Sequence, residues 1–198
     1  MTSVLLPVRI ARAVRDTTPA DNAGLVELAR SCPMRGDITM CVERAPDFFA
    51  LSRLEGHRWR VGIAEDRGTV VGCVAASERL AYVNGAATRI AYVGDLKVHP
   101  AHRNRVVADS LEEFSREAVR SFGGDDMLVL ATVLGGNRAM ERRAAGPRGL
   151  PTLTRFATLD VHAIPLLWPR AHAVAGLRVC ASGASPFSAA RTAANRLE

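Results

Sequence analysis

Apolar residues recur along this chain with two spacings, one typical of strands and the other typical of helices. Strands are indicated where apolar and polar residues alternate, or where a short apolar run is bounded by turn residues. Helices are indicated where apolar residues lie three and four positions apart. The predicted strands cover residues 8–14, 58–64, 69–76, 88–98 and 127–134, and the predicted helices cover 19–30, 46–55, 105–122 and 137–145. The chain is therefore expected to fold as an α/β domain.

Turn and capping residues mark the ends of several elements. Thr18 and Pro19 are typical of the N-cap and first position of a helix. A tight turn is expected at residues 66–68, and Asn84-Gly85, the strongest short hairpin signal in the chain, indicates that the strand after this turn extends beyond residue 76. The remaining expectations are an irregular segment over 32–39, one or two strands within 152–164, and a last helix over 187–197.

The composition is that of an ordinary soluble globular protein. A chain of 198 residues suits one domain, with or without an appendage, and 48% hydrophobic and 23% charged residues are ordinary values. The formal net charge of +6 raises nucleic-acid binding as an alternative. The arginines, however, are scattered among acidic residues, and no aromatic RNA-stacking motif is present. An anionic cofactor would use part of the excess charge, and we expect no nucleic-acid partner.

Cysteine spacing and hydropathy indicate the compartment. The four cysteines lie far apart and show no spacing typical of metal ligands, so no metal site is expected. Cys73 falls within an apolar strand pattern and is expected to be buried and inert. The apolar run at residues 4–8 lacks a basic leader, and no apolar stretch approaches membrane-spanning length. We therefore expect a reduced, cytoplasmic protein without membrane contact.

The segment from Tyr92 to Leu111 carries the clearest functional signal. It is predicted to be a strand that ends at Pro100, followed by a basic turn and the first turns of a helix. A helix N-terminus presents free backbone N–H groups and partial positive charge, and an arginine just ahead of it can hold two phosphate oxygens. This segment is therefore predicted to bind a phosphate-bearing ligand, the alternative being a solvated basic loop at a helix start.

The order of elements and several linked motifs resemble the GCN5-related N-acetyltransferase (GNAT) family. The motifs are residues 15–21 at the first strand-to-helix junction, 71–74 in the central hairpin, 94–103 at the predicted phosphate turn, and Asn137 at the start of the next helix. The resemblance covers roughly residues 8–168, and we expect a domain over 1–168 followed by a tail over 169–198. It implies a mixed, mostly antiparallel central sheet with helices on both faces. It also implies a splayed parallel pair, formed by strands 88–98 and 127–134.

The resemblance implies acetyl-CoA as the cofactor and transfer of an acetyl group directly to an amine. The pantetheine arm is expected to pair with backbone groups of the strand, as an added strand does. The pyrophosphate is expected on the backbone amides of the following turn, and Asn137 is expected to contact the arm or to order the end of its strand. The implied cofactor-binding residues are Leu96, Lys97, Val98, Arg103, Asn104, Arg105, Val106, Val107, Ala108 and Asn137.

Two features depart from the family pattern. Val106 and Asn104 stand where the family prefers glycine, and valine adds a stiff branched side chain where phosphate approaches the backbone. The tyrosine that often protonates the leaving thiolate is also missing, since alanines occupy its expected places in residues 137–146, and Tyr82 and Tyr92 do not match the motif. A non-catalytic acyl-CoA-binding or regulatory domain is therefore the alternative function.

Asp95 and His99 are the candidate catalytic residues. Asp95 lies on the predicted cofactor strand and could accept the amine proton, or could be a polar strand residue bonded to a neighbour. His99 is a candidate because histidine as a residue type can exchange protons near neutral pH, and the alternative is a surface histidine at the strand end. Glu65 and Glu78 either line the acceptor pocket or are solvated charges near strand ends.

The acceptor is left open as a small-molecule or peptide amine. Residues 34–43 join the first two helices to the sheet and are expected to flank its site, as the resemblance implies. The oligomeric state is also open, since the tail from Arg170 could pair with a neighbour in a homodimer, pack on its own sheet, or connect to a further domain.

Overall fold

The computed structural model describes residues 14–103, 105–144, 153–155 and 157–160. The chain divides into two compact units, residues 1–155 and 156–198. The elements below all lie in the first unit. The predicted tail over 169–198, the last helix and most of the predicted strand 8–14 lie outside the described residues. The segments 153–155 and 157–160 contain no strand, and the rest of the strand prediction for 152–164 is likewise outside what is described.

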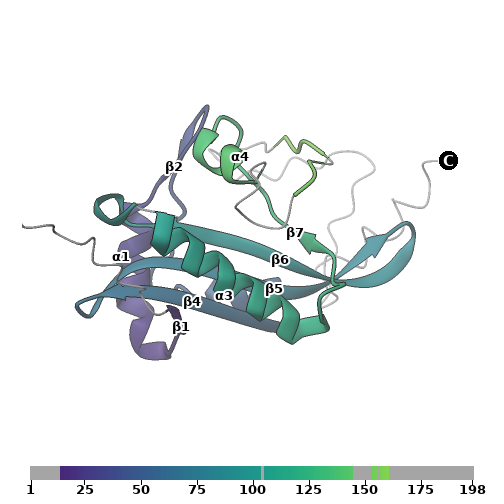
Figure 1. The fold of residues 1–198 in the computed structure, drawn as a ribbon, viewed down its shortest axis with the longest axis horizontal. Helices are drawn as coiled ribbons and strands as arrows, with labels where there is room; N and C mark the ends of the chain where they lie inside the picture. Colours follow the sequence, from purple (N-terminus) through teal and green to yellow (C-terminus); the bar gives the residue numbers. More distant parts are fainter. Residues whose placement is uncertain (1–13, 104, 145–152, 156, 161–198) are drawn as a thin grey trace, which may run out of the picture. The chain divides into compact units, whose positions relative to one another are not determined.

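A mixed, mostly antiparallel sheet forms the centre of this unit (Figure 1). Among the described residues its strand order is β1-β4-β5-β6-β7, and only the pair β6–β7 is parallel. A separate small hairpin is formed by β2 and β3, in the segment predicted to be irregular. The strands are β1 (Val14–Asp16), β2 (Met34–Arg35), β3 (Thr39–Met40), β4 (Arg58–Asp66), β5 (Thr69–Val83), β6 (Ala86–Val98) and β7 (Val129–Leu130).

Helices cover both faces of the sheet, as the sequence predicts. They are the 3₁₀ turns η1 (Pro19–Asp21) and η2 (Pro100–His102), and α1 (Asn22–Ser31), α2 (Ala50–Glu55), α3 (Arg105–Gly123) and α4 (Arg138–Ala144). α3 packs on one face against Val74, Ala76 and other alternate residues of the sheet. α1 and the residues before α2 pack on the opposite face, against Ile63 and Cys73. We call these the α3 face and the α1 face.

Two glycines of the sheet allow α3 to lie close to it. A Cβ atom at Gly72 would lie 2.9 Å from Leu111 Cδ1, and one at Gly62 would collide with the ring of Phe114. Leu111 and Val107 are fully buried between helix and sheet. The position of α3, and with it the orientation of its N-terminus, therefore depends on these small residues.

The central hairpin is longer than the apolar pattern alone predicts. Asn84 and Gly85 have φ values of 51° and 77°, which are typical of a two-residue hairpin turn, and β5 and β6 pair continuously up to it. Arg67 and Gly68 form a similar turn between β4 and β5, with φ values of 51° and 80°. The expectations from residues 66–68 and from Asn84-Gly85 are thus confirmed.

The predicted strand over 127–134 is much shorter in the structure. Only Val129 and Leu130 pair with β6, opposite Ala91 and Tyr92. Beyond Leu130 the chain leaves the sheet and runs to α4 (Figure 1). The apolar pattern was misleading here because Leu128 and Val133 are 53% and 37% exposed, and an apolar, strand-favouring sequence does not by itself decide whether a backbone pairs with a neighbouring strand.

Glu78 differs from both of its sequence interpretations. It lies inside β5, is buried, and pairs with Arg89 and with Arg58 at 3.4 Å. The same two arginines donate to the carbonyl oxygen of Phe122 at the end of α3, at 3.1 and 2.8 Å. Glu78 therefore holds the arginines that satisfy the last carbonyl groups of this helix.

Acid is expected to loosen the junction between β1 and α1. Asp21 accepts hydrogen bonds from Arg15 (2.8 and 2.9 Å) and from the backbone N–H of Thr18 (2.7 Å), and the Arg15 bonds hold the pKa of Asp21 well below its ordinary value. A carboxyl whose folded pKa is lowered stabilises the fold above its unfolded pKa, near 4, and loses that contribution as pH falls through the folded pKa.

We therefore expect the urea midpoint to fall below about pH 4, and Asp21→Asn to reduce this fall while lowering the midpoint at pH 7. Urea titrations at pH 7, 4 and 3 measure both effects. Asp125→Asn is the matched control, because Asp125 pairs with Arg120 on an exposed surface. An equal acid response in wild type and Asp21→Asn contradicts the prediction.

Candidate active site

The edge of β6 opens where β7 ends. The amide of Ala91 donates to the carbonyl oxygen of Leu128 on the β7 side (2.9 Å), whereas the amide of His99 donates to Val71 of β5 (2.8 Å). Because backbone groups alternate along a strand, those of Leu96 and Val98 face away from β5. Within the described residues this side of β6 has no strand partner beyond Tyr92. A ligand amide could therefore bond to Leu96 and Val98.

A bulge at Asp95 bends β6 beside this open edge. The register with β5 shifts between Cys73 and Ala75, and Asp95 has a φ of 52°, unusual for a residue with a side chain. The carbonyl oxygen of Asp95 accepts a bond from the Cys73 thiol at 3.3 Å. Burial raises the pKa of that thiol, as expected for an inert cysteine.

The carboxylate of Asp95 is held between two cations. Arg44, from the segment before α2, pairs with Oδ2, and Lys97 Nζ lies 3.0 Å from Oδ1. Arg44 is 7% exposed, its guanidinium lies over the Phe48 ring, and its Nε has no hydrogen-bond partner. The cluster Arg44–Asp95–Lys97 thus links the segment before α2 to the bulge of β6.

Lys97 was predicted to bind the cofactor, and its side chain lies on the α1 face. It is opposite Cys73, whose side chain packs with α1, while its neighbours Leu96 and Val98 pack with the α3-face core. The Lys97 ammonium is therefore directed to the face opposite α3. Its bond to Asp95 makes it part of the bulge, whereas its backbone remains on the open strand.

The turn after β6 leads directly into α3. The Nδ1 of His99 accepts a bond from the amide of Ala101 at 3.3 Å, so His99 caps η2. The Arg103 side chain is exposed, and its Nε donates to the carbonyl oxygen of Val98 at 3.4 Å. Asn104 and the side chain of Arg105 lie outside the described residues. The geometry thus brings Arg103 close to the N-terminus of α3 and to the open end of β6.

The first turn of α3 differs from its sequence interpretation at Val106. Val106 is helical and 43% exposed, while Val107 points into the core beneath the helix and Ala108 is partly buried. The backbone at position 106 therefore does not need glycine for its conformation. Only the bulk of the valine side chain, which projects outward, can affect a group that approaches this helix end.

The segment between α1 and α2 reaches across to the chain that follows β7. The amide of Asp37, in the β2–β3 hairpin, donates to the carbonyl oxygen of Gly135 at 3.0 Å. A side chain at Gly36 would collide with this same carbonyl group. Figure 1 shows the hairpin and the start of α4 next to each other. The open edge of β6 is thus flanked on this side by residues 34–40, close to the predicted 34–43.

Asn137 directly precedes α4 (Arg138–Ala144), one residue from the predicted helix start, and its Oδ1 accepts a bond from the amide of Met140 at 3.3 Å. The helix is attached to α3 by Arg143, which pairs with Asp109 and with the buried carboxylate of Glu112. The described part of α4, Arg138–Ala144, contains no tyrosine.

The position of Tyr92 at the opening between β6 and β7 was not predicted from the sequence. Tyr92 lies on β6 beside the last residue of β7, and its hydroxyl oxygen is 2.6 Å from Thr132 Oγ1 across the opening. The guanidinium of Arg79 stacks on its ring at 4.1 Å. No motif signals this position, because the contact partner belongs to a segment forty residues away.

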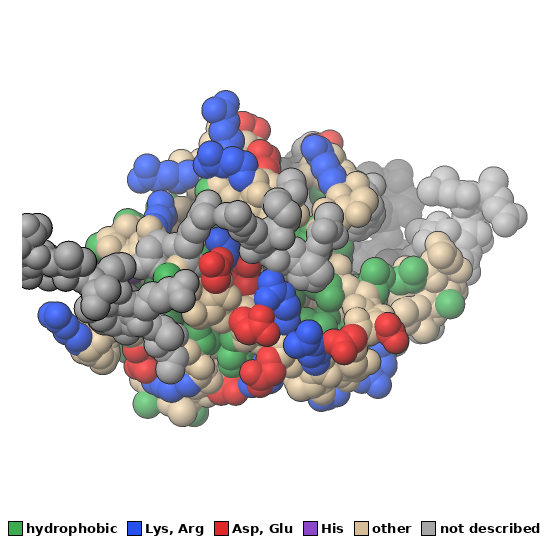
Figure 2. Space-filling model, in the orientation of Figure 1, with side chains coloured by type: hydrophobic (Ala, Val, Ile, Leu, Met, Phe, Trp, Pro, Cys, Tyr) green, Lys and Arg blue, Asp and Glu red, His purple; other side chains and the backbone are tan. Residues whose placement is uncertain are grey.

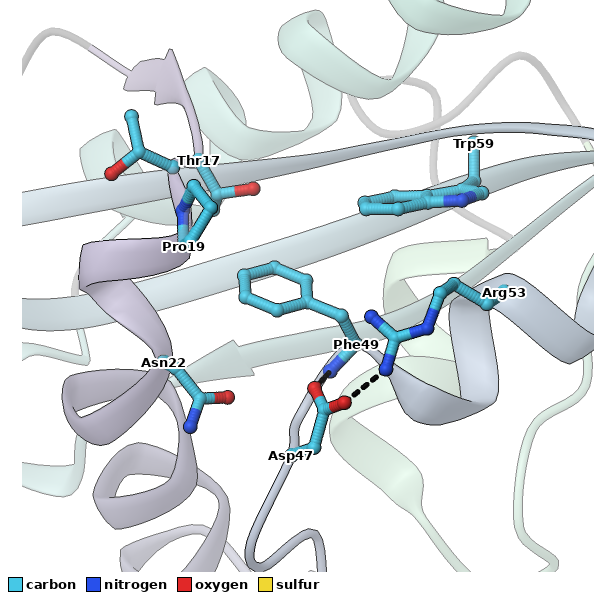
Figure 3. Close-up of a pocket in the computed structure, with 8 residues that line it drawn as sticks. Thr17, Pro19, Asn22, Asp47, Phe49, Arg53 and Trp59 are labelled. Carbon is cyan, nitrogen blue, oxygen red and sulfur yellow. Dashed lines mark hydrogen bonds and ion pairs between the residues drawn. The ribbon is translucent and has the colours of Figure 1, made fainter.

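A cavity of about 480 Å³ lies elsewhere on the α1 face, between η1 and α2 (Figure 3). Phe49 and Trp59 stack in it with ring centroids 5.8 Å apart. Its ionic groups are already paired, since Asp47 accepts bonds from Arg53 and from the amide of Phe49 (3.0 Å). None of its lining residues comes from β6, β7 or α3, so it is separate from the open edge.

The charges on the face that carries α3 are mixed. Figure 2 shows basic and acidic side chains interspersed over it. The ion pairs Arg60–Asp16 (2.6 Å) and Arg116–Glu113 (2.5 Å) are examples. None of the helices that the structure describes is long and apolar enough to cross a membrane. No group of histidine, cysteine and acidic residues in the described part of the chain could hold a metal ion.

The fold and the open edge define a mixed α/β protein with one splayed parallel strand pair, a bulge beside it and a helix N-terminus at its end. Residues 38–132 match the family model described as acetyltransferase (GNAT) domain. This match assigns residues 38–132 to the GNAT acetyltransferase domain and agrees with the resemblance of the sequence motifs.

Solved structures share this fold at low sequence identity. The aminoglycoside acetyltransferase AAC(6')-Iy, in complex with a bisubstrate analogue of CoA, is 18% identical with a TM-score of 0.54, over 76% of this chain and 98% of that one. A putative acetyltransferase from Agrobacterium tumefaciens is 17% identical with a TM-score of 0.52, over 75% and 99% of the two chains. The 6'-N-acetyltransferase AAC(6')-IG from Acinetobacter haemolyticus is 19% identical with a TM-score of 0.50, over 75% of this chain and 99% of that one. No curated protein matches the chain.

Proposed function

We propose that this protein is an acetyl-CoA-dependent N-acetyltransferase that moves an acetyl group directly to an amine of a small molecule or peptide. The observation that carries the proposal is the open edge of β6, which ends at a helix N-terminus. Backbone groups at Leu96 and Val98 suit the amides of a pantetheine arm, and the N–H groups of the first turn of α3, with Arg103, suit a pyrophosphate. Asn137 is proposed to order the chain beside the arm.

When bound, acetyl-CoA supplies an activated acetyl thioester. We propose that Asp95 accepts the proton that the amine loses, directly or through a water molecule. Each Asp95 oxygen already receives one bond from a cation, and a carboxylate oxygen has a second acceptor site for such a proton. His99 caps η2 with its Nδ1 and lies at the phosphate end of β6, so its proposed role is to shape the turn.

A non-catalytic acyl-CoA-binding domain is the second candidate. It is favoured by the exposed valine at position 106 and by the absence of tyrosine from Arg138–Ala144. The two candidates differ in turnover, since both bind the cofactor and only the first releases free CoA when an amine is present.

Calorimetry with acetyl-CoA, followed by a free-thiol assay over a panel of amines, tests the proposal. We expect binding below millimolar concentration and thiol release that depends on the amine. Binding without release for every amine supports the non-catalytic candidate. Absence of binding at millimolar concentration contradicts both. The panel includes aminoglycosides, because the AAC(6')-Iy structure holds a CoA–acetylneamine analogue.

Removing the side chain of Val106 is expected to tighten CoA binding. Val106 is exposed on the first turn of α3, so Val106→Gly clears space for a pyrophosphate without opening a core cavity. Glycine costs up to about 1 kcal/mol of helix stability, which sets a limit to the gain. Calorimetry is expected to show a few-fold lower Kd, and Val106→Ala, with less helix cost, a similar change. Unchanged or weaker binding in both variants shows that the valine does not hinder the phosphates.

A further inference from the structure

We infer that Tyr92 is the general acid of this acetyltransferase and takes the place of the tyrosine missing from α4. The inference rests on the proposed function and adds a catalytic residue to it. It follows from the position of the Tyr92 hydroxyl at the point where β6 and β7 separate.

The Tyr92 ring lies on the α1 face of β6. Its neighbours Ala91 and Val93 point into the core beneath α3, so alternation along the strand directs Tyr92 and Gly94 to the other side. The ring leans along the strand toward Gly94, where a Cβ atom would lie only 2.9 Å from Tyr92 Cε1. Glycine at position 94 therefore makes room for the ring.

The hydroxyl group reaches the level at which the two strands diverge. Tyr92 pairs with Leu130, the last residue of β7, but its hydroxyl bonds to Thr132, two residues further along. The hydroxyl thus crosses from β6 to the chain after β7 at the closed end of the opening. The bulge at Asp95 lies a few residues further along β6.

This closed end is where the reacting end of the cofactor belongs. The phosphate-binding terminus of α3 follows the C-terminal end of β6, so a pantetheine arm that runs from it along Val98 and Leu96 has its sulfur end toward Gly94. A tyrosine hydroxyl there can donate to sulfur. Tyr82, by contrast, lies near the tip of the hairpin, opposite Ala87 and away from β7.

The proposed step balances as follows. The amine nitrogen forms a bond to the acetyl carbon, the carbon–sulfur bond breaks, and its electron pair stays on sulfur. The nitrogen loses a proton to Asp95 or to water, and sulfur gains the proton of the Tyr92 hydroxyl. Asp95 or water then releases the amine proton to solvent, and solvent returns a proton to the Tyr92 oxygen, so both residues regain their starting states and the products are the amide and the free thiol of CoA.

Surrounding groups hold the ring in this position. Arg79 stacks on one side of it, and Thr132 Oγ1 can accept the hydroxyl proton or donate its own. Thr132 is therefore a positioning residue, and Thr132→Val removes the partner but leaves the phenol. A purely structural role for the Tyr92–Thr132 bond is the competing explanation. It predicts that Tyr92→Phe and Thr132→Val lower stability equally and that neither changes the preference for CoA over desulfo-CoA.

The first arm of the test measures binding and needs no acceptor. Calorimetry compares CoA with desulfo-CoA for wild type, Tyr92→Phe and Tyr82→Phe. We expect wild type and Tyr82→Phe to bind CoA about fivefold more tightly than desulfo-CoA, the value of one hydrogen bond, and Tyr92→Phe to bind both equally. A preference for CoA that is absent from wild type, or that persists in Tyr92→Phe, overturns the inference.

The second arm measures thiol release with an amine that wild type acetylates. We expect Tyr92→Phe to lower kcat about 100-fold with little change in the KM for acetyl-CoA, and Thr132→Val to lower it less. Thermal unfolding of the variants shows whether the fold is intact. An unchanged kcat in Tyr92→Phe overturns the inference. If no amine is acetylated by wild type although CoA binds, the proposed function fails, and the binding arm still decides whether Tyr92 contacts sulfur.

Discussion

Replacing Arg44 by methionine is expected to lower the free energy of unfolding by about 3 kcal/mol and to abolish most thiol release. Breaking a buried ion pair by removing one partner typically costs about 3–5 kcal/mol, because the other charge stays buried without compensation. Lys97 still pairs with Asp95 at 3.0 Å, which places the expected loss at the lower end. The activity is lost because Arg44 joins the segment before α2 to the bulge of β6.

Urea unfolding, followed by tryptophan fluorescence, measures this change. Arg30→Met is the matched control, since Arg30 pairs with Glu43 at 3.4 Å on the surface and such pairs contribute about 0–1 kcal/mol. A double-mutant cycle of Arg44→Met with Asp95→Asn is expected to give a coupling of about 1–3 kcal/mol. A loss in Arg44→Met no larger than in Arg30→Met contradicts the prediction.

Truncating Leu111 to alanine is expected to cost about 3–5 kcal/mol of stability and to weaken CoA binding. Leu111 is fully buried between α3 and Gly72, so its removal leaves a cavity in a rigidly packed layer. The cavity lies under the helix whose N-terminus is proposed to hold the pyrophosphate. Movement of the helix into this space displaces its first turn from the end of β6.

Leu54→Ala is the control for this substitution. Leu54 lies on α2 and is 84% exposed, so the same change of side chain is expected to alter stability by less than about 0.5 kcal/mol. Urea unfolding and calorimetry with CoA measure the two effects separately. A loss of stability below about 1 kcal/mol in Leu111→Ala contradicts the proposed packing. If stability falls by the expected amount but the affinity for CoA is unchanged, the position of α3 does not control phosphate binding, and that part of the prediction is wrong.

The sequence predicts much of the fold because its signals are local. Helix periodicity and end residues placed α1, α3 and α4 to within a few residues, and Asn84-Gly85 fixed the turn of the central hairpin. The predicted length of β7 was wrong, because the number of paired residues depends on where β6 and β7 diverge and not on the apolar residues of β7 itself. The β2–β3 hairpin was missed for a similar reason, since its contact with Gly135 is made across the fold.

The candidate site divides in the same way. The placement of the continuous segment from Leu96 to Arg103 at the end of a strand and ahead of a helix could be predicted, since strand, turn and helix start follow one another in the chain. The ion pair of Asp95 with Arg44 could not be predicted, because Arg44 lies fifty-one residues away in the chain. The resemblance implies Lys97 as a cofactor-binding residue, and only the structure shows that its side chain points to the α1 face and pairs with Asp95.

The sequence by itself determined most of the order of elements, the strand–turn–helix unit that joins β6 to α3, and the family resemblance, since each element and each motif is encoded by residues close together in the chain. Only the tertiary structure decided which side chains meet at the opening between β6 and β7. It joined Tyr92 to Thr132 and Arg44 to Asp95, contacts between segments that the chain keeps far apart. The physical reason is that strand pairing and burial act between distant segments, and no local pattern records which segments will meet.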